Sequence, residues 1–96
     1  MIVIVATLKA KAGKEEGIIR NMNALVKAVR INEPGNMEYV FHRSLKTPAV
    51  FMVYEKYKSG EAVQSHMSAK HFQDAARKFP ETLDGAMTIE TYSVIE

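Results

Sequence analysis

The sequence predicts an α+β fold of the ferredoxin-like type, with the element order βαββαβ and one antiparallel sheet. An apolar run rich in β-branched residues opens the chain, and a long stretch with helical spacing of apolar residues follows it. Two alternating segments joined by a short turn come next, and then helical spacing and a last alternating segment. A chain of 96 residues builds one hydrophobic core, so we expect a single domain over residues 1–96.

The first strand is predicted at residues 2–8, and both of its faces are apolar. One face carries Ile2, Ile4, Ala6 and Leu8, and the other carries Val3, Val5 and Thr7. An apolar strand face is stable only when it is covered, and helices of one short chain can cover only one face of a sheet. We therefore expect a second subunit to cover the other face.

A helix is predicted at residues 14–31, after the break at Gly13. Glutamates in its first turn and basic residues in its last turn suit the helix dipole. Its apolar residues fall on a single stripe, which favours a role in the core. The stripe consists of Ile18, Ile19, Met22, Leu25, Val26 and Val29.

An antiparallel hairpin is predicted next, with strands at residues 36–45 and 50–58 and a turn at residues 46–48. Pro34-Gly35 precedes the first of these strands. Tyr39 shares one strand face with Phe41, whereas His42 lies on the opposite face. Sequence alternation does not tell which of these two faces is buried.

Two short helices and a strand complete the expected order. Ser59 is a candidate N-cap for a helix that reaches Met67, and Ser68 is a candidate N-cap for a second helix. Pro80 predicts the end of that second helix. The last strand is predicted at residues 87–95. Because the helices would cover one face of the sheet, pairing of two bare faces predicts a homodimer built as a dimeric α/β barrel.

The composition excludes several classes of function. The net charge of +2 and the scattered basic residues argue against a nucleic-acid partner. The chain has no cysteine, which excludes disulfides, thiolate metal sites and cysteine nucleophiles. The five glycines form no phosphate-binding loop, so we expect no nucleotide cofactor. The first eight residues are too few to span a membrane and lack a basic lead, so we expect no membrane partner and a cytoplasmic location.

Two histidines are the leading candidates for chemistry. A histidine of near-neutral pKa can accept a proton from a phenol at physiological pH. His66 and His71 would point about 140° apart on one continuous helix, but a helix break at Ser68 could turn both toward one cavity. The plainer alternative is that each caps a helix or faces solvent. A metal site would need His42 or Glu55 as third ligand, and no recognised metal spacing supports one, so we expect none.

Glu55 and the aromatic residues are the other candidates. Glu55 interrupts an apolar strand face, where a carboxylate is costly unless it is paired. It would orient a histidine or bind a substrate hydroxyl, or else form a structural bridge to Arg43 or to a backbone amide. Aromatic side chains suit the walls of a slot for a planar substrate, although they would equally suit a core. These side chains are Tyr39, Phe41, Phe51, Tyr57 and Phe72, of which Tyr39 and Phe72 are the strongest candidates for ligand contact.

Three short runs together resemble the antibiotic biosynthesis monooxygenase family over nearly the whole chain. The first run is Glu33-Pro34-Gly35 with Tyr39 and His42-Arg43-Ser44, the second is Tyr54-Glu55 with Tyr57, and the third is His66 with His71-Phe72. The resemblance implies a dimeric α/β barrel and a pocket beside the histidines. His42 and Arg43 become secondary candidates for substrate contact.

The resemblance also implies a reaction without metal or prosthetic group. Members of the family deprotonate a quinol or polyphenol, whose anion passes an electron to O2, and the resulting radicals combine and collapse to a quinone. In this chain His66, His71 and Glu55 would be the catalytic residues. Haem-degrading members use a pocket tryptophan, and this chain has none, so haem is not the expected substrate.

Two alternative functions stay open from the sequence. Relatives that isomerise a phosphorylated signalling sugar resemble the chain at Glu33, Gly35, Tyr54-Glu55, Tyr57 and the two histidines. Such a substrate would need a cationic clamp for its phosphate, for which Arg43 or Lys70 could serve. A dimer that binds a small aromatic molecule without turnover is the other alternative.

Overall fold

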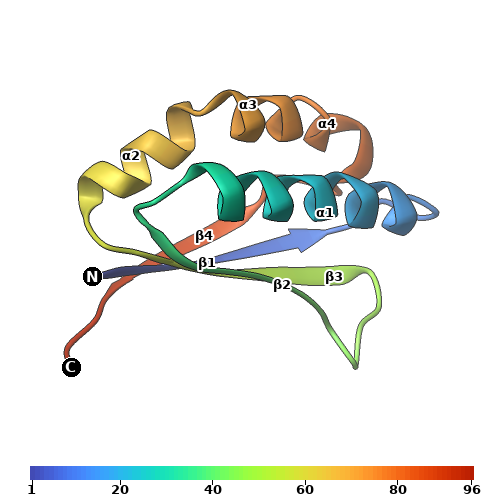
Figure 1. The fold of residues 1–96 in the computed structure, drawn as a ribbon. Coiled ribbons are helices and arrows are strands. Elements are labelled where there is room, and N and C mark those ends of the chain that lie inside the picture. Colours follow the sequence, from blue (N-terminus) through green and yellow to red (C-terminus); the bar gives the residue numbers. More distant parts are fainter.

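The computed structural model describes residues 1–96 and confirms the ferredoxin-like α+β fold. Four strands form one sheet, and Figure 1 shows every helix on the same side of it. Three short helices occupy the region in which two short helices were predicted. The elements are β1 (Ile2–Lys9), α1 (Glu15–Asn32), β2 (Asn36–Arg43), β3 (Val50–Tyr57), α2 (Gly60–Ser68), α3 (Lys70–Ala76), α4 (Phe79–Thr82) and β4 (Thr88–Ser93).

The sheet has the strand order β2-β3-β1-β4, and every neighbouring pair is antiparallel. Its register aligns four residues in one row across all the strands. Tyr39 pairs with Glu55, Glu55 with Ile4, and Ile4 with Thr91. Opposed residues of a sheet project to the same face. This row therefore presents a carboxylate and a phenol side by side to the helices.

The core lies between the inner face of the sheet and α1. The predicted helical stripe is confirmed, with Ile18, Met22 and Val29 almost fully buried. Asn21 was not predicted to be buried, and its Nδ2 donates to the backbone oxygen of Ala75 at 3.0 Å. This bond ties α1 to α3 and satisfies a polar group that would otherwise be costly to bury.

The junction between α2 and α3 differs in detail from the prediction. Ser59 caps α2 as expected, because its Oγ accepts from the Ala62 amide at 3.3 Å. Ser68 does not cap α3: its Oγ donates back to the Gln64 carbonyl at 2.9 Å. The N-cap position is Ala69, whose extended backbone (ψ 143°) breaks the helix without a side-chain bond. The break expected near this point is confirmed, but its capping residue was wrong.

Pro80 does not end α3, which already stops at Ala76. It lies in the first turn of α4 instead, where a missing N–H leaves no helical bond unmade.

The outer face of the sheet carries no helix (Figure 1). Val3, Val5 and Tyr54 are half-buried there, whereas Val40 and Tyr92 are exposed. Within one chain the sheet is open and does not close into a barrel. No helix of the chain combines the length and the apolarity needed to cross a membrane.

Candidate functional site

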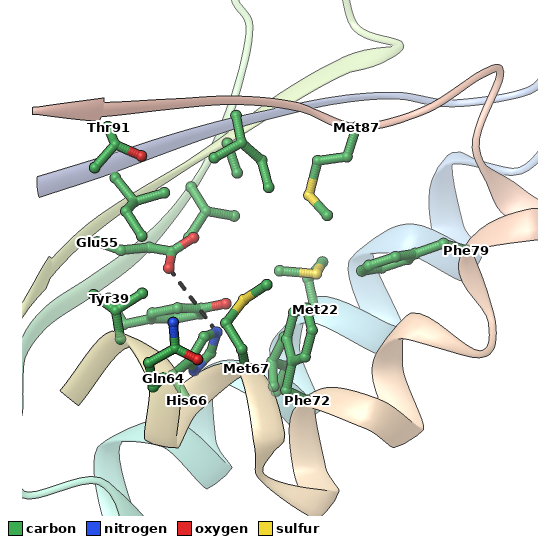
Figure 2. Close-up of a pocket in the computed structure, with 16 residues that line it drawn as sticks. Met22, Tyr39, Glu55, Gln64, His66, Met67, Phe72, Phe79, Met87 and Thr91 are labelled. Carbon is green, nitrogen blue, oxygen red and sulfur yellow. Dashed lines mark ion pairs between the residues drawn. The ribbon is translucent and has the colours of Figure 1, made fainter. Parts of the chain in front are cut away.

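A pocket of about 220 Å³ lies between the inner face of the sheet and the helices. Figure 2 shows polar side chains gathered at one end of it and methionine and phenylalanine side chains at the other. Of its 16 lining residues, 12 are hydrophobic, a proportion that suits an apolar ligand with few polar groups. The side chains labelled toward the apolar end are Met22, Met67, Phe72, Phe79 and Met87.

The polar end is built from the residue row of the sheet and from α2. Tyr39, Glu55 and Thr91 line it from β2, β3 and β4, and His66 lines it from α2. The His66 side chain is only 2% exposed. Figure 2 shows the imidazole and the Glu55 carboxylate facing each other at this end. The structure thus brings together four residues that the sequence distributes over more than 50 positions.

Glu33 contacts both histidines, although its side chain was not among the expected site residues. His66 Nδ1 lies within hydrogen-bond distance of the Glu33 carboxylate, at 2.9 Å from Oε2 and 3.1 Å from Oε1. His71 Nε2 is hydrogen-bonded to the same Oε2 atom. The Glu33 side chain is 8% exposed, so the two imidazoles supply the hydrogen bonds that its burial requires.

The break at Ala69 explains why one carboxylate reaches two histidines five residues apart. His66 lies near the end of α2 and His71 near the start of α3, and the extended residue between the helices redirects the chain. Both rings then meet Glu33, with their centroids 6.5 Å apart. Only His66 lines the pocket, whereas the His71 side chain is 20% exposed and lines a separate cleft together with Glu33.

The second nitrogen of His66 faces Glu55 across a gap. Nε2 lies 4.0 Å from Glu55 Oε1, too far for a direct hydrogen bond. Glu55 Oε1 instead accepts from the Tyr57 hydroxyl at 2.7 Å. Tyr57 is fully buried and supports the carboxylate from behind the pocket wall. A bridge from Glu55 to Arg43, one of the alternatives open from the sequence, does not form, because Arg43 Nε donates to the Pro48 oxygen instead.

Burial perturbs the titration of these groups. Desolvation raises the pKa of Glu55 to about 7, and the Glu33 charge adds to this, although the Tyr57 hydrogen bond acts in the opposite direction. Desolvation lowers the pKa of His66, and the Glu33 hydrogen bond and charge only partly offset that effect. Burial also raises the pKa of Tyr39 and of Tyr57. The pocket therefore holds a neutral imidazole and neutral phenols at neutral pH.

Aromatic rings enclose the His66 imidazole and fix its orientation. Its centroid lies 4.9 Å from the Phe72 ring, 5.4 Å from Tyr39 and 5.6 Å from Tyr57, all in tilted arrangements. Tyr39 and Phe72 line the pocket as the sequence predicted, while Tyr57 supports it from the core.

Besides His71 and Tyr57, four predicted residues lie outside this pocket. Phe41 and Phe51 stack on each other in the core, with centroids 5.3 Å apart. His42 is exposed on the outer face of the sheet, and its Nδ1 lies 3.0 Å from the Val40 oxygen. Arg43 Nε donates to the Pro48 oxygen, and its guanidinium lies over the Phe51 ring. The structure does not bring these four side chains to the polar end.

Glu33, His66 and His71 also have the composition of a metal-ligand set, with ligand atoms within 4.8 Å of one another. The sequence pointed to His42 or Glu55 as a possible third ligand, and the structure places Glu33 there instead. In the structure the three side chains are hydrogen-bonded to one another, which accounts for their proximity. The signal that could have identified Glu33 is its position next to Pro34-Gly35 at the end of α1, but its partners lie 33 and 38 residues further along the chain.

Comparison with known proteins places these features in context. The profile of the antibiotic biosynthesis monooxygenase family matches residues 1–78. The chain is 30% identical over 89 residues to "Putative monooxygenase YcnE" of Bacillus subtilis (strain 168), which covers 93% of each protein. It also matches the crystal structure of a "putative antibiotic biosynthesis monooxygenase" of Caulobacter crescentus, at 33% identity with a TM-score of 0.94, over 99% of this chain and 90% of the other. Protein SO0527 of Shewanella oneidensis matches at 28% identity with a TM-score of 0.88, over 95% and 87% of the two chains.

Proposed function

This chain belongs to the antibiotic biosynthesis monooxygenase family, and we propose that it oxidises a small quinol or polyphenol with O2 without a metal or prosthetic group. His66 is the general base in this proposal. Glu55 binds the substrate hydroxyl, and Tyr39 and Phe72 contact the aromatic ring.

The observation that carries the proposal is the 4.0 Å gap between His66 Nε2 and Glu55 Oε1 at the polar end of an apolar pocket. A phenolic hydroxyl placed in this gap reaches both atoms with hydrogen bonds of ordinary length, roughly 2.8 Å. The hydroxyl donates to Nε2, which carries no hydrogen when Nδ1 is the protonated nitrogen of His66. It accepts a hydrogen bond from Glu55 when that carboxyl is protonated. The ring of the substrate then extends toward the apolar end.

The proton and electron steps follow from this placement. His66 removes the phenolic proton, and the electron-rich phenolate passes one electron to O2, which gives a phenoxyl radical and superoxide. The two radicals combine at a ring carbon, and the peroxide takes the proton back from His66. The ring carbon then loses its proton to the base while the O–O bond breaks, and the departing hydroxide takes a proton to become water. Overall, the phenol and O2 give a quinone and water.

The pocket contributes by stabilising the anion and limiting water. A protonated Glu55 donates to the phenolate oxygen as negative charge develops on it, in surroundings of low polarity where such a bond is strong. Burial raises the pKa of Glu55 to about 7, which keeps a proton on it near neutral pH. The apolar walls favour flat aromatic substrates over hydrated ones.

The pocket offers little to a phosphorylated sugar. No lysine or arginine is among the residues that line it. Arg43 donates to the Pro48 oxygen, and Lys70 Nζ pairs with Asp74 at 2.7 Å on the surface. These contacts favour an uncharged aromatic substrate over the isomerase alternative.

We also propose that the chain forms a homodimer in which the outer sheet faces of two copies pack together. The apolar side chains of Val3, Val5 and Tyr54 lie on that face, where no helix of the same chain covers them. Two sheets packed in this way form the dimeric α/β barrel that the sequence predicts.

The test is oxygen consumption by chelator-treated protein with a panel of quinols and polyphenols of one to three rings. We expect uptake above autoxidation for some of them, with one O2 consumed for each quinone formed and no hydrogen peroxide released. Binding of a phenol without any uptake would support the non-catalytic alternative and refute the oxygenase proposal.

A further inference from the structure

We propose that Glu33 is the positioning residue for His66, and that His71 holds the Glu33 carboxylate in place from the other side. The inference rests on the proposed function, because it concerns how the base of that reaction is prepared. Glu33 does not line the pocket and touches no substrate in this account. It acts through the imidazole.

The hydrogen bonds of Glu33 determine which nitrogen of His66 can act as the base. An ionised carboxylate only accepts hydrogen bonds, so the Nδ1 atom that lies 2.9 Å from Glu33 Oε2 carries the ring hydrogen. In the neutral imidazole the other nitrogen is then bare. That nitrogen, Nε2, is the one that faces Glu55 and the pocket. Glu33 thereby points the basic lone pair at the substrate position.

The backbone around Glu33 holds the carboxylate at this point. Its own N–H donates to the Val29 oxygen at the end of α1, and its oxygen accepts from the Asn36 amide at 3.1 Å. Gly35 packs so tightly against α2 that a Cβ there would lie 2.6 Å from the Cβ of Ala62. The turn between α1 and β2 is therefore pressed against the helix that carries His66. These backbone hydrogen bonds and close packing hold the Glu33 side chain in place more precisely than a flexible loop would.

His71 completes the arrangement from the polar side. Its Nε2 donates to the same Oε2 atom that His66 Nδ1 approaches, and it lines a polar cleft with Asn36 and Ser65. A second donor on Oε2 restricts rotation of the carboxylate. When His66 takes up a proton during the reaction, the adjacent Glu33 charge stabilises the imidazolium. In this arrangement His66 lies in the pocket as the base, and His71 holds the Glu33 carboxylate in place.

The pKa of His66 gives a readout that a merely structural role would not move. The Glu33 hydrogen bond and charge raise this pKa against the effect of burial, so Glu33→Gln should lower it further. His71 acts on it as a like charge, and the carboxyl of Glu55 lies 4.0 Å from Nε2. The titratable groups that face His66 are Glu33, His71, Glu55, Tyr39 and Tyr57.

The deciding experiment is 15N NMR of the imidazoles over a pH titration of the metal-free protein without substrate. We expect the His66 signal of the wild-type protein to report Nδ1–H and a bare Nε2. Glu33→Gln should lower the His66 pKa and mix the two tautomers, while the exposed His42 signal stays unchanged. A wild-type His66 that is protonated on Nε2, or one whose titration is the same in Glu33→Gln, would overturn the assignment.

Two further arms separate this inference from the proposed function. His71→Gln keeps a side-chain amide that can donate to Glu33, and should preserve the tautomer of His66, whereas His71→Ala should weaken its preference. If Glu33→Gln fails to fold, the tautomer of His66 in the wild-type protein still tests the role of Glu33, and identical His66 tautomers in His71→Gln and His71→Ala would refute the role of His71. Saturable binding of added Zn²⁺ that shifts the signals of His66 and His71, and that is lost in both His71→Gln and His71→Ala, would identify a metal-ligand set instead.

The oxygen-uptake assay provides a kinetic test. In this assay Glu33→Gln should lower kcat by roughly 10²-fold and leave KM almost unchanged. A wild-type protein without uptake refutes the function alone.

Discussion

The two ring nitrogens of His66 have different surroundings: Nδ1 lies 2.9 Å from Glu33 Oε2, whereas Nε2 faces Glu55 Oε1 across 4.0 Å. One nitrogen is thus engaged by a carboxylate outside the pocket, and the other is available inside it. An imidazole that is buried, oriented and open on one side is suited to exchange a proton with a bound ligand. We expect the chemistry of the pocket to depend on this asymmetry of His66.

The first prediction concerns the pH dependence of oxidation. Turnover needs neutral His66 and protonated Glu55, so kcat/KM should follow a bell. The acid limb should fall below pH 6.5, because burial lowers the pKa of His66, and the alkaline limb should lie near pH 7, where Glu55 loses its proton. Glu55→Gln keeps a donor without a titration and should abolish the alkaline limb. Initial rates from pH 5 to 9 measure this, and an unchanged alkaline limb in Glu55→Gln would contradict the role of Glu55.

The second prediction concerns stability against pH. Native Glu55 keeps its proton up to about pH 7, whereas the unfolded chain loses it near pH 4.5. Stability therefore falls as pH rises from 4.5 to 7, and the cost of the buried carboxylate is fully present above 7. Glu55→Gln removes this cost. Its free energy of unfolding relative to the wild type should therefore be higher at pH 8 than at pH 5, by roughly 1–3 kcal/mol. Urea unfolding of the wild type and of Glu55→Gln at pH 5 and pH 8 measures the difference between their free energies of unfolding. If this difference is the same at both pH values, the pKa of Glu55 is not raised.

The third prediction concerns the size of the substrate. Met87 lines the apolar end of the pocket, so Met87→Trp should shorten the space for rings beyond the first. We expect kcat/KM for two-ring and three-ring quinols to fall by at least tenfold, and that for one-ring quinols to change little. Met37→Trp, at an exposed position of β2, is the matched control. Equal losses for all ring sizes would show that the substrate does not extend toward Met87.

The fourth prediction concerns the oligomer. Tyr54 lies half-buried on the outer face of the sheet, so a charge there should oppose packing of two sheets. Sedimentation velocity should show a dimer for the wild-type protein and a monomer for Tyr54→Lys. Ile31→Lys, which places the same charge at an exposed apolar position of α1, should remain dimeric. A monomeric wild-type protein would refute the barrel.

The fold could be predicted from the sequence because the spacing of apolar residues along each helix and strand is a local signal. The stripe of α1 and the alternation of β3 follow from which residues must leave water, and the structure confirms both. The capping details were less predictable. Ser68 has the residue type of an N-cap, but its hydroxyl bonds back to Gln64 and leaves Ala69 at the junction, a choice that local preference does not determine.

The candidate site was predicted only in part. His66, Glu55, Tyr39 and Phe72 do meet in one pocket. Which face of β2 points inward depends on where α1 packs, so the sequence could not choose between Tyr39 and His42. Glu33 depends on still more distant contacts, because its two histidine partners lie on different helices. Its residue type and its place at a helix end are common features of surface turns.

The most direct test compares oxygen consumption by three metal-free proteins with the best quinol of the panel: wild type, His66→Gln and His42→Gln. His42 is the matched control, because it is exposed on the opposite face of the sheet. We expect His66→Gln to lose roughly 10²–10⁴-fold in kcat and His42→Gln to retain wild-type turnover. Equal activity of His66→Gln and the wild type would contradict the assignment of His66 as the base.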